Sequence, residues 1–544
     1  MPMNIWIATR EYAEIAEAGG VKNVASSLSE ALVKAGHHVT VFIPEYACSH
    51  YSRLDEYEAE YKGYEGINTV SINILKQTQS VKYGSGKMKG VDFIFVKHPS
   101  FADKEGVYVY TRHEEELNPK HKNGQGHEDC LFMDALFQKA VCAFANICPD
   151  EKSPQILHCQ DATTAMIPCF IKFGLDLSRK KKNFYKNTKC VVTIHNAGPG
   201  YHHEIYKIKK AKDLTGLRRI VLRGARNPEN KDLIEPFLLG AKNAFFTTVS
   251  PQYAEEIQKG LTQTQGLSKG FDSKKIQITG ITNGIDYERY NPSSKKDSLL
   301  PFEYNPELMD FEGKKKLRLY FYEKYASQEK LLPNRQLPNI YQFGYLSEDC
   351  RQPVFVYQGR VVSQKGIAQL AEASRIVLKN GINAKFVFMG QGQSELENLL
   401  ASVAAEFPGK ALYYRGYDRF LSRLCIAQAD FSIIPSEFEP CCLEDFISQI
   451  YGTIPVAHQT GGLGKIINEY NGYLYENNSP EEIAGIITSL ATIYNNMGSE
   501  TFNPMRSYAS SYVKENYSWK SVCEDQYLPF YMSILAENHI YYKF

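Results

Sequence analysis

The chain has 544 residues, a formal net charge of +1, 43% hydrophobic and 12% aromatic residues. This length provides for two or three domains, each with its own core, and the balanced charge excludes a general binder of nucleic acid. The basic run at 179–182 is balanced elsewhere by acidic residues, so we interpret it as a solvated loop.

Export signals and metal-ligand spacings are both missing from the sequence pattern. The first apolar run, Ile5–Ala8, is too short for the core of a secretory signal, and no later run is long enough to span a membrane. The twelve cysteines are irregularly spaced, and Cys441 and Cys442 are adjacent. We therefore expect a cytoplasmic protein with reduced thiols, no bound metal and no membrane association. The sequence carries no signal for an oligomeric state.

The first half of the chain begins with a βαβ pattern. A strand at Ile5–Ala8 precedes a helix whose apolar period starts at Val24, and a strand follows at Val39–Pro44. Gly19 and Gly20 stand at the strand-to-helix turn, where glycines allow a backbone to approach a ligand closely. Further strands are expected at 93–96, 155–158, 190–195 and 245–249, with a helix at 131–145.

The second half repeats this alternation. Strands are expected at 354–357, 385–389, 411–415, 431–435 and 454–456, with helices between them. Two such series predict an α/β protein with two doubly wound, Rossmann-like domains. Asn283–Asp286 is a turn signal, and the following residues are charged and poorly periodic. We predict domains at 1–285 and 286–515, with 286–350 as hinge or insertion, and a C-terminal helix at 516–544 that packs on the first domain.

Polar residues gather at the predicted carboxyl ends of the strands. Facing α/β domains bind ligands outside these ends, in the cleft between them. The loop after 354–357 carries Arg360 and Lys365, whose guanidinium and ammonium groups suit diphosphate oxygens. Taken alone, this short motif is more often an ordinary connection with surface cations. Other polar residues at strand ends are His158, Asp161, His195, Asn196, Glu437, Glu439 and Thr460.

Six segments, in order along the chain, resemble the bacterial and plant glycogen/starch synthase family, which are retaining glycosyltransferases with the GT-B fold. The segments are TIHN at 193–196, TVSPQYAEEI at 248–257, TNGID at 282–286, GRVVSQKG at 359–366, PSEFEPC at 435–441, and YGTIP at 451–455 with TGGL at 460–463. The Tyr-Ser-Trp sequence at 517–519 also resembles the start of the closing helix of the family. The resemblance covers most of the chain.

The resemblance implies a role for each matching residue. Arg360 and Lys365 would bind the diphosphate of a nucleoside-diphosphate glucose, ADP-glucose or UDP-glucose, so that no metal or other cofactor is needed. Glu439 and His195 would contact the transferred glucose, and Tyr417 would stack on the base. Asp161 and Glu17 would lie on the acceptor side. The other implied donor contacts are Gly19, Gly20, Asn196, Asn283, Cys441, Cys442, Leu443, Thr460, Gly461 and Gly462.

Departures from the family pattern concentrate in the first half. The usual Lys-x-Gly-Gly-Leu with a following carboxylate becomes a loop with Glu17 and Asn23. Either Glu17 turns toward sugar hydroxyls, or the donor lies differently, or Lys22 supplies the missing charge. The usual His-Ala-His-Asp-Trp-His becomes HCQDAT at 158–163, the glycine of Glu-Pro-Cys-Gly becomes Cys442, and 331–350 is longer than the usual connection.

The leading hypothesis is a glucosyltransferase that extends the non-reducing end of an α-1,4-glucan with retention of configuration. Its partners would be the nucleotide sugar and the glucan, with no nucleic acid. One alternative is a retaining GT-B transferase with another acceptor, because the neighbourhood of Asp161 is altered. Another is a non-catalytic, glucan-binding regulatory protein, because the loop lysine is missing. Retention of His195, Arg360, Lys365 and Glu439 argues against this last reading.

Overall fold

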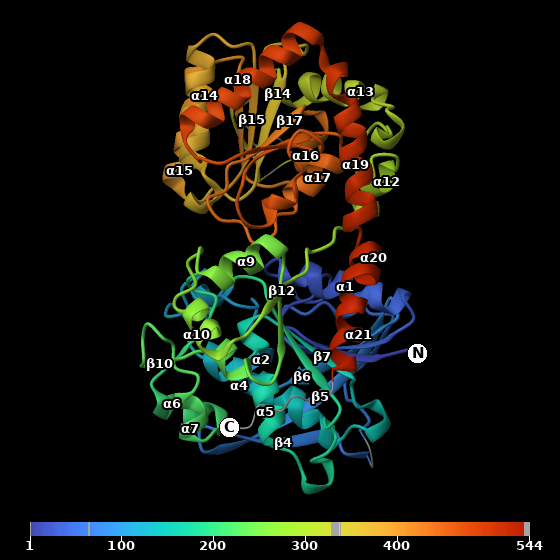
Figure 1. Ribbon diagram of the computed structural model, residues 1–544, viewed down its shortest axis with the longest axis vertical. Coiled ribbons are helices and arrows are strands. Elements are labelled where there is room, and N and C mark those ends of the chain that lie inside the picture. Colours follow the sequence, from blue (N-terminus) through green and yellow to red (C-terminus); the bar gives the residue numbers. More distant parts are fainter. Residues whose placement is uncertain (1, 64–65, 328–336, 338, 538–544) are drawn as a thin grey trace. The chain divides into compact units, whose positions relative to one another are not determined.

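The computed structural model describes residues 2–63, 66–327, 337 and 339–537 (Figure 1). The chain forms two compact units: unit 1 comprises Met1–Gly284 with Val522–Phe544, and unit 2 comprises Ile285–Ser521. The boundaries predicted from the sequence were residues 285 and 515. Among the described residues, no helix is both long and apolar enough to cross a membrane.

A ten-stranded sheet forms the centre of unit 1. Its parallel part runs, in spatial order, β12 (Ile278–Gly280), β11 (Phe245–Thr248), β8 (Lys189–Ile194), β7 (Ile156–Gln160), β1 (Asn4–Ala8), β2 (His38–Pro44) and β6 (Val91–Lys97). The strands that follow β1 in sequence lie on one side of it, and those from β7 onward lie on the other. The order therefore reverses at β1, which makes the end of this strand a topological switch point.

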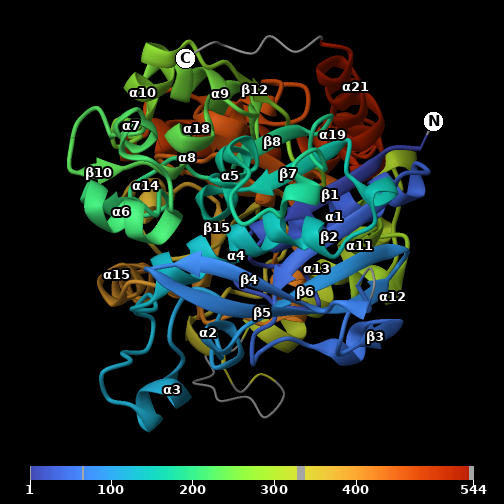
Figure 2. The same cartoon turned by 90° about the horizontal axis from the view of Figure 1, so that it is seen from below.

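An antiparallel extension completes this sheet. β5 (Gln77–Met88) pairs with β6, β4 (Thr69–Ile74) and β3 (Glu56–Glu58), and Figure 2 shows β4 and β5 side by side. These three strands were not predicted from the sequence. β5 is rich in polar residues and contains Gly84 and Gly86, so its alternation of buried and exposed positions is weak in the sequence.

The helices of unit 1 follow the expected α/β alternation. α1 (Val21–Lys34) and α4 (Cys130–Ala143) confirm the two helices predicted from apolar periodicity. The others are α2 (Pro99–Ala102), α3 (Arg112–Leu117), α5 (Ile167–Phe173), α6 (Ile208–Thr215), α7 (Arg219–Arg223), α8 (Pro236–Gly240), α9 (Pro251–Lys259), α10 (Leu267–Lys274) and, near the end of the chain, α21 (Leu528–Ala536).

The end of the described chain returns to the sheet of unit 1. The Tyr531 hydroxyl on α21 lies 2.7 Å from Nδ1 of His158 on β7, and Lys189 Nζ donates to the carbonyl oxygen of Glu537 at 2.9 Å. α20 (Trp519–Val522) precedes this segment. The helix expected over 516–544 is thus helical through most of 519–536, and its last part, 538–544, lies outside the described residues.

Unit 2 is built on a seven-stranded sheet with the order β13 (Tyr341–Gly344), β16 (Ala411–Arg415), β15 (Lys385–Gly390), β14 (Val354–Gln358), β17 (Phe431–Ile434), β18 (Ile454–His458) and β19 (Tyr473–Tyr475). Within the part of the chain that the structure describes, β13 pairs antiparallel with β16 and the other neighbouring strands pair parallel. The five strands predicted for this half are confirmed, and the order reverses at β14. The loop with Arg360 therefore follows the switch-point strand of this sheet, as the glycine loop does in unit 1.

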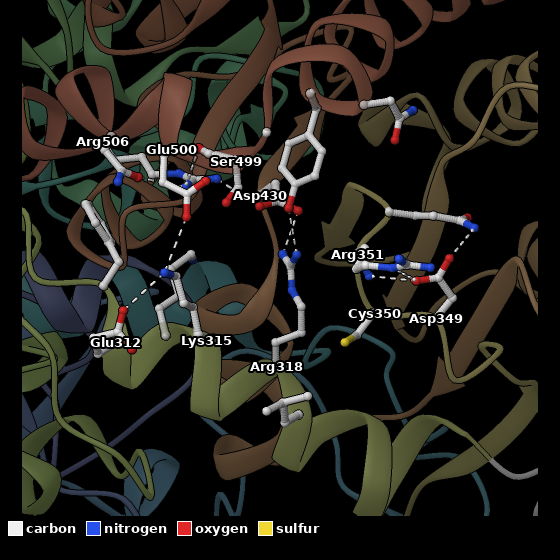
Figure 3. A pocket seen from close by; sticks show the side chains of 18 of the residues that line it. Glu312, Lys315, Arg318, Asp349, Cys350, Arg351, Asp430, Ser499, Glu500 and Arg506 are labelled. Atoms are coloured by element: carbon white, nitrogen blue, oxygen red, sulfur yellow. Dashed lines mark hydrogen bonds and ion pairs between the residues drawn. The ribbon is translucent and has the colours of Figure 1, made fainter.

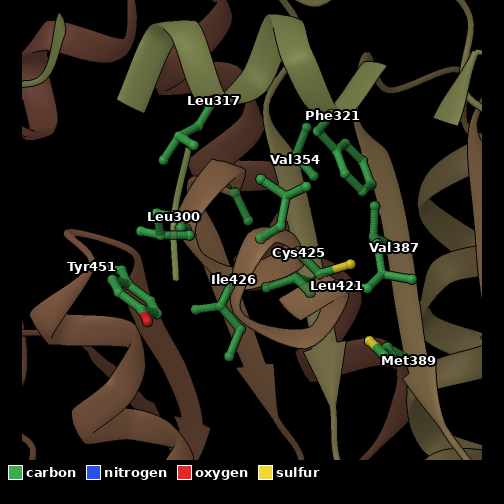
Figure 4. Packing of buried hydrophobic residues seen from close by; sticks show 14 of the residues in the cluster. Leu300, Leu317, Phe321, Val354, Val387, Met389, Leu421, Cys425, Ile426 and Tyr451 are labelled. Atoms are coloured by element: carbon green, nitrogen blue, oxygen red, sulfur yellow. The ribbon is translucent and has the colours of Figure 1, made fainter. Parts of the chain in front are cut away.

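Helices cover both faces of this second sheet. Leu317 and Phe321 of α13 (Glu312–Phe321) and Leu421 of α16 (Arg419–Gln428) pack with Val354 and Val387 on one face (Figure 4). The other face packs against α14 (Ile367–Lys379), α15 (Ser394–Glu406) and α18 (Pro480–Met497). Strands buried on both faces explain the continuous apolar runs in the sequence. The remaining helices of unit 2 are α11 (Tyr287–Tyr290), α12 (Lys295–Ser298), α17 (Glu444–Ile450) and α19 (Asn503–Tyr517).

The segment predicted as a hinge or insertion, 286–350, differs from that expectation in its described part. Leu300, Tyr304 and Phe311, like Leu317 and Phe321, are buried in the core of unit 2. The helices of the segment are short, so each shows too few turns for an apolar period to stand out among the charged residues. Residues 328–336 and 338, which include part of the long connection expected at 331–350, lie outside the described residues.

Candidate active site

The loop after β14 lies against the loop after β17. Gly366, at its end, has φ +66°, and a Cβ added there would lie 1.8 Å from the carbonyl oxygen of Pro435. Only glycine fits this close approach of two backbones. The Glu437 amide donates to the carbonyl oxygen of Gln364 at 2.9 Å, which fixes the same approach. The SQKG sequence thus brings Lys365 onto the loop that carries Glu439.

Lys365 and Glu439 form a buried ion pair at this junction. Lys365 Nζ contacts Glu439 Oε2, the two side chains are 12% and 10% exposed, and Ser436 Oγ donates to the same oxygen at 3.1 Å. Burial opposes the charge of the ammonium group, but Glu439 and Glu444 outweigh it and raise the pKa of Lys365. Lys365 is therefore a fixed cation at neutral pH.

Arg360 is the second cation of the loop, and its side chain is exposed. The Tyr357 hydroxyl donates to its carbonyl oxygen at 2.8 Å, which anchors the backbone. Within the described residues, the guanidinium group takes part in no hydrogen bond or ion pair. Its five N–H donors are available to an anion.

Two further loops meet beside the ion pair. The Gly462 amide donates to the carbonyl oxygen of Glu439 at 2.7 Å, and a Cβ on Gly462 would lie 2.3 Å from Cα of Cys441. Lys465 Nζ donates to three carbonyl oxygens: that of Gly462 at 3.0 Å, that of Cys442 at 3.2 Å, and that of Cys441. It also forms an ion pair with Asp445 at 3.0 Å. Lys465 thus binds the TGGL turn to the loop at 441–442.

Lys465 was not among the residues predicted from the sequence. The signal was present, because a lysine three residues after a Gly-Gly turn can reach the carbonyl groups of that turn. A buried ammonium group with an aspartate and three carbonyl acceptors is a positioning element, since all its donors are used within the protein.

Cys442 has a left-handed backbone with φ +65°. This explains the glycine of the family pattern, since glycine adopts that conformation without the penalty of a side chain. The Sγ of Cys442 donates to Glu444 Oε2 at 3.2 Å, and the Leu443 amide donates to the same oxygen at 3.2 Å. Burial raises the pKa of the Cys442 thiol, so the group stays protonated and can donate.

Tyr417 and Thr460 lie at the margin of this group. Tyr417 follows β16, two strands from β14, and is 60% exposed. Its neighbour Asp418 caps α16 through the Leu421 amide at 2.8 Å. Thr460 Oγ1 lies 3.4 Å from the carbonyl oxygen of Glu437. Base stacking by Tyr417 stays a prediction.

In unit 1, the glycine loop after β1 is closed by Glu11, which was not among the predicted site residues. The carboxylate of Glu11, 1% exposed, accepts from the amides of Ala18 (3.0 Å) and Gly19. A Cβ on Gly19 would lie 3.1 Å from Glu11 Oε1, whereas one on Gly20 would meet nothing within 4 Å. A side chain at position 19 would therefore crowd the Glu11 carboxylate, and the Gly19 amide is already occupied by that carboxylate.

Glu17 and Lys22 pair with each other. Lys22 Nζ lies 2.8 Å from Glu17 Oε2, and Glu17 Oε1 accepts from the Glu14 amide at 2.7 Å. One alternative was that Lys22 supplies the charge of the missing loop lysine. The ion pair with Glu17 argues against it, because the Lys22 ammonium group is already paired. The loop carries a neutral ion pair where the family pattern has a cation.

Two histidines lie on or directly after neighbouring strands in unit 1. His158 is inside β7, not at the end of the strand where the sequence predicted it, whereas His195 follows β8. His158 on β7 is fully buried between Tyr531 and Thr193, whose Oγ1 lies 2.6 Å from its Nε2. His195, directly after β8, has its Nε2 2.7 Å from Oε1 of Gln160. Burial lowers the pKa of His158 to about 3 and that of His195 to about 4. Both imidazoles are therefore neutral at pH 7.

Asp161, after β7, has an unusual backbone and environment. Its φ is +67° and its ψ −177°, a region that residues other than glycine rarely occupy. Its Oδ1 is buried and has no hydrogen-bond partner among the described residues. Burial raises the pKa of Asp161 to about 7. Strain and an unsatisfied oxygen at a strand end are typical of a group held for a ligand.

The other predicted residues of unit 1 lie at the same edge of the sheet. Asn196 Oδ1 accepts from the Gly198 amide at 2.7 Å and so shapes its own turn. Asn283, after β12, is 7% exposed, and its Oδ1 has no partner among the described residues. Glu17, Gly19, Asp161, His195 and Asn196 follow three adjacent strands, whereas Asn283 follows the last strand of the sheet. In unit 2, the predicted residues other than Tyr417 follow the adjacent strands β14, β17 and β18.

A pocket of about 780 Å³ in unit 2 lies apart from these residues (Figure 3). It is at the opposite edge of the sheet, where Asp430 precedes β17. Asp430 pairs there with Arg318 at 2.5 Å and with Arg506 at 2.8 Å. Lys315 pairs with Glu312 and Glu500 in the same way. These ion pairs join α13 and α19 to the sheet, and we interpret them as structural.

Each half of the chain matches a known family model. Residues 4–272 match the family model of the starch synthase catalytic domain, and residues 345–503 match that of the glycosyl transferases group 1. A glycogen synthase from Thermodesulfovibrio yellowstonii is 28% identical over 98% of this chain and 99% of its own length. One from Flavobacterium johnsoniae is 28% identical over 98% and 100%.

The fold is also that of a solved glycosyltransferase. The catalytic domain of starch synthase IV from Arabidopsis thaliana, bound to ADP and acarbose, superposes with a TM-score of 0.76 at 22% identity, covering 99% of this chain and 100% of that one. The sucrose-phosphate synthase of Thermosynechococcus elongatus gives a TM-score of 0.52 at 14% identity. The two doubly wound sheets are those of the GT-B fold predicted from the sequence.

Proposed function

Since the chain belongs to the glycogen/starch synthase family of glycosyltransferases, we propose that it transfers glucose from a nucleoside-diphosphate glucose to the non-reducing end of an α-1,4-glucan, with retention of configuration. The bond from glucose C1 to the diphosphate oxygen breaks, and a bond from C1 to O4 of the acceptor forms. The hydroxyl proton of the acceptor leaves with the nucleoside diphosphate or passes to solvent.

The observation that carries this proposal is the cation pair after β14. Negative charge grows on the departing diphosphate, and fixed cations stabilise that charge where it develops. Lys365 is held in place by Glu439, so little reorganisation is needed when the charge appears. Arg360 has its donors available for the planar contact that guanidinium makes with phosphate oxygens. We propose that these two side chains replace a metal ion in neutralising the leaving group.

Glu439 and His195 are proposed to contact the transferred glucose. Glu439 keeps an oxygen for a sugar hydroxyl, because Oε2 holds both Lys365 and Ser436 and Oε1 holds neither. His195 is neutral at pH 7, so it is suited to hydrogen bonding with sugar hydroxyls. The Gly462 amide contacts the carbonyl oxygen of Glu439, so the two loops meet here. Backbone groups around Cys441–Leu443 and Thr460–Gly462 are proposed to bind sugar and phosphate oxygens.

Asp161 is proposed to face the acceptor glucan. Its unsatisfied Oδ1 can accept a hydrogen bond from a sugar hydroxyl, which would remove the penalty of burying that oxygen alone. The Glu17–Lys22 pair leaves this region without the cation of the family pattern. The side chains of Arg360 and Lys365 should therefore provide nearly all the charge that binds the diphosphate, whichever base the donor carries.

A donor panel tests the proposal. Purified protein is given glycogen primer with ADP-glucose, UDP-glucose or GDP-glucose, and nucleotide release is followed with and without a chelator. We expect release from one donor, insensitive to the chelator, and lost in Lys365→Ala. Lys379→Ala, an exposed lysine on α14, is the matched control and should retain activity. The absence of release from all three donors would overturn the proposal.

A further inference from the structure

A second pocket, of about 390 Å³, lies in unit 1. Its walls come from α7, α8, α10 and the loop at 224–231, and α7 and α10 lie near β10 (Leu233–Ile234) in both views (Figures 1 and 2). Among the described residues, ten line it, of which five are cationic and none is aspartate or glutamate. The cations are Arg223, Arg226, Lys231, Lys269 and Lys274. No residue of the candidate active site lines this pocket.

The positive charge of this pocket is poorly compensated. Lys269 pairs with Glu229 at 2.7 Å, but both side chains are exposed, so that pair contributes little. The other four cations form no ion pair within the described residues. Lys274 Nζ donates to the carbonyl oxygen of Gly224 at 2.6 Å. With a net charge of only +1 on the whole chain, this concentration is a local feature.

Two groups of the pocket are poorly satisfied by the protein itself. Nε of Arg226 is buried and has no hydrogen-bond partner among the described residues. Burial and the nearby ammonium group of Lys242 lower the pKa of Lys274. A buried donor without an acceptor and a cation beside another cation are both unfavourable, and one anion would relieve both.

The size of the pocket restricts the anion to a small one. A volume of about 390 Å³ is near the lower end of ligand pockets, so it suits a phosphate group with at most one sugar. Gly270 of α10 lies tightly against Leu238, since a Cβ there would be 2.8 Å from the leucine side chain. Gly270 and Leu238 thus form an apolar part of the pocket wall, beside the cationic residues that also line it.

We propose that this pocket binds a phosphate dianion, either as inorganic phosphate or as a monoester on one sugar residue. That residue is a free hexose or one unit of a glucan whose remaining units stay outside the pocket. Arg223 and Arg226 offer planar forks for phosphate oxygens, and Lys231 and Lys274 add point charges. The phosphate site does not depend on the transfer reaction. The folded chain should bind phosphate there even if it released nucleotide from none of the three donors.

The test is calorimetric titration of the full chain with inorganic phosphate at low ionic strength. We expect saturable binding that weakens at least tenfold in Arg226→Gln/Lys274→Gln. The matched control is Arg179→Gln/Lys180→Gln, which removes the same charges from the exposed basic run and should bind phosphate as the wild type does. Lys365→Met should also retain binding, which separates this pocket from the diphosphate site. If the double variant does not fold, Lys231→Gln, exposed and without an ion pair, should weaken binding several-fold.

The source of the phosphate is resolved by two further titrations, with a hexose monophosphate and with a phosphorylated α-glucan. Tighter binding of either one than of inorganic phosphate, lost in Arg226→Gln/Lys274→Gln, supports the proposal and identifies the source. Three results would overturn it: no saturable phosphate binding to the wild type, equal binding to the pocket variant, or binding lost in Lys365→Met.

Discussion

Lys365→Met removes the ammonium group proposed to stabilise the departing diphosphate while keeping the length of the side chain. At about 4 Å and an effective dielectric constant of about 20, one unit-charge contact is worth about 4 kcal/mol. If that contact is made fully only in the transition state, kcat/KM falls about a thousandfold. The same change leaves Glu439 buried without its ion-pair partner, which lowers the free energy of unfolding by about 3 kcal/mol.

Activity and stability can be separated with Lys365→Met/Glu439→Gln. The neutral amide has no charge to leave unpaired, so we expect most of the lost stability to return in denaturant titration. Activity should not return, because the cation is still absent. The assay is steady-state nucleotide release at saturating glycogen. A folded Lys365→Met variant that keeps kcat/KM within tenfold of the wild type would refute the assignment of Lys365.

Three further predictions concern residues where the chain departs from expectation. Glu17→Gln should release Lys22 from its ion pair and lower KM for the donor several-fold, whereas the control Glu14→Gln should not. An unchanged KM in Glu17→Gln would show that Lys22 does not reach the diphosphate. Cys442→Gly should raise the free energy of unfolding by about 1 kcal/mol, because glycine adopts the left-handed conformation without strain. If the free energy of unfolding instead fell by more than about 1 kcal/mol, the hydrogen bond of the thiol to Glu444 would be the larger effect. The pKa of Asp161 is raised to about 7, so this carboxyl group becomes protonated below that pH and kcat/KM should fall there. Asp161→Asn should abolish this acid-side fall. The same fall in the variant would assign it to another group.

The parallel strands were predictable because they are buried on both faces. Runs such as Val354–Tyr357 are apolar throughout, and the positions of their ends are enough to place Arg360, Lys365 and Glu439 at one edge of the sheet. The antiparallel strand β5 was not predictable, since its polar residues and its two glycines conceal the alternation. The apolar residues at 300–326 were overlooked because charged neighbours separate them.

The sequence predicted which residues of the site follow the strands, but it did not predict their contacts. Sequence spacing cannot show that Glu11 occupies the amides of the glycine loop, because that contact depends on how the chain folds back after β1. It cannot show Lys465 holding three carbonyl groups, because those acceptors belong to the backbone. The substitution of Cys442 for glycine was visible, but its left-handed conformation is a property of the folded loop.

The central claim is that this chain lengthens an α-glucan with glucose from a nucleotide sugar. The most direct measurement compares nucleotide released with glucose incorporated into a labelled malto-oligosaccharide whose products are sized. The account predicts one nucleotide for each added glucose and a ladder of products joined by α-1,4 linkages. Nucleotide release without longer products, or a single transfer to another acceptor, would contradict it.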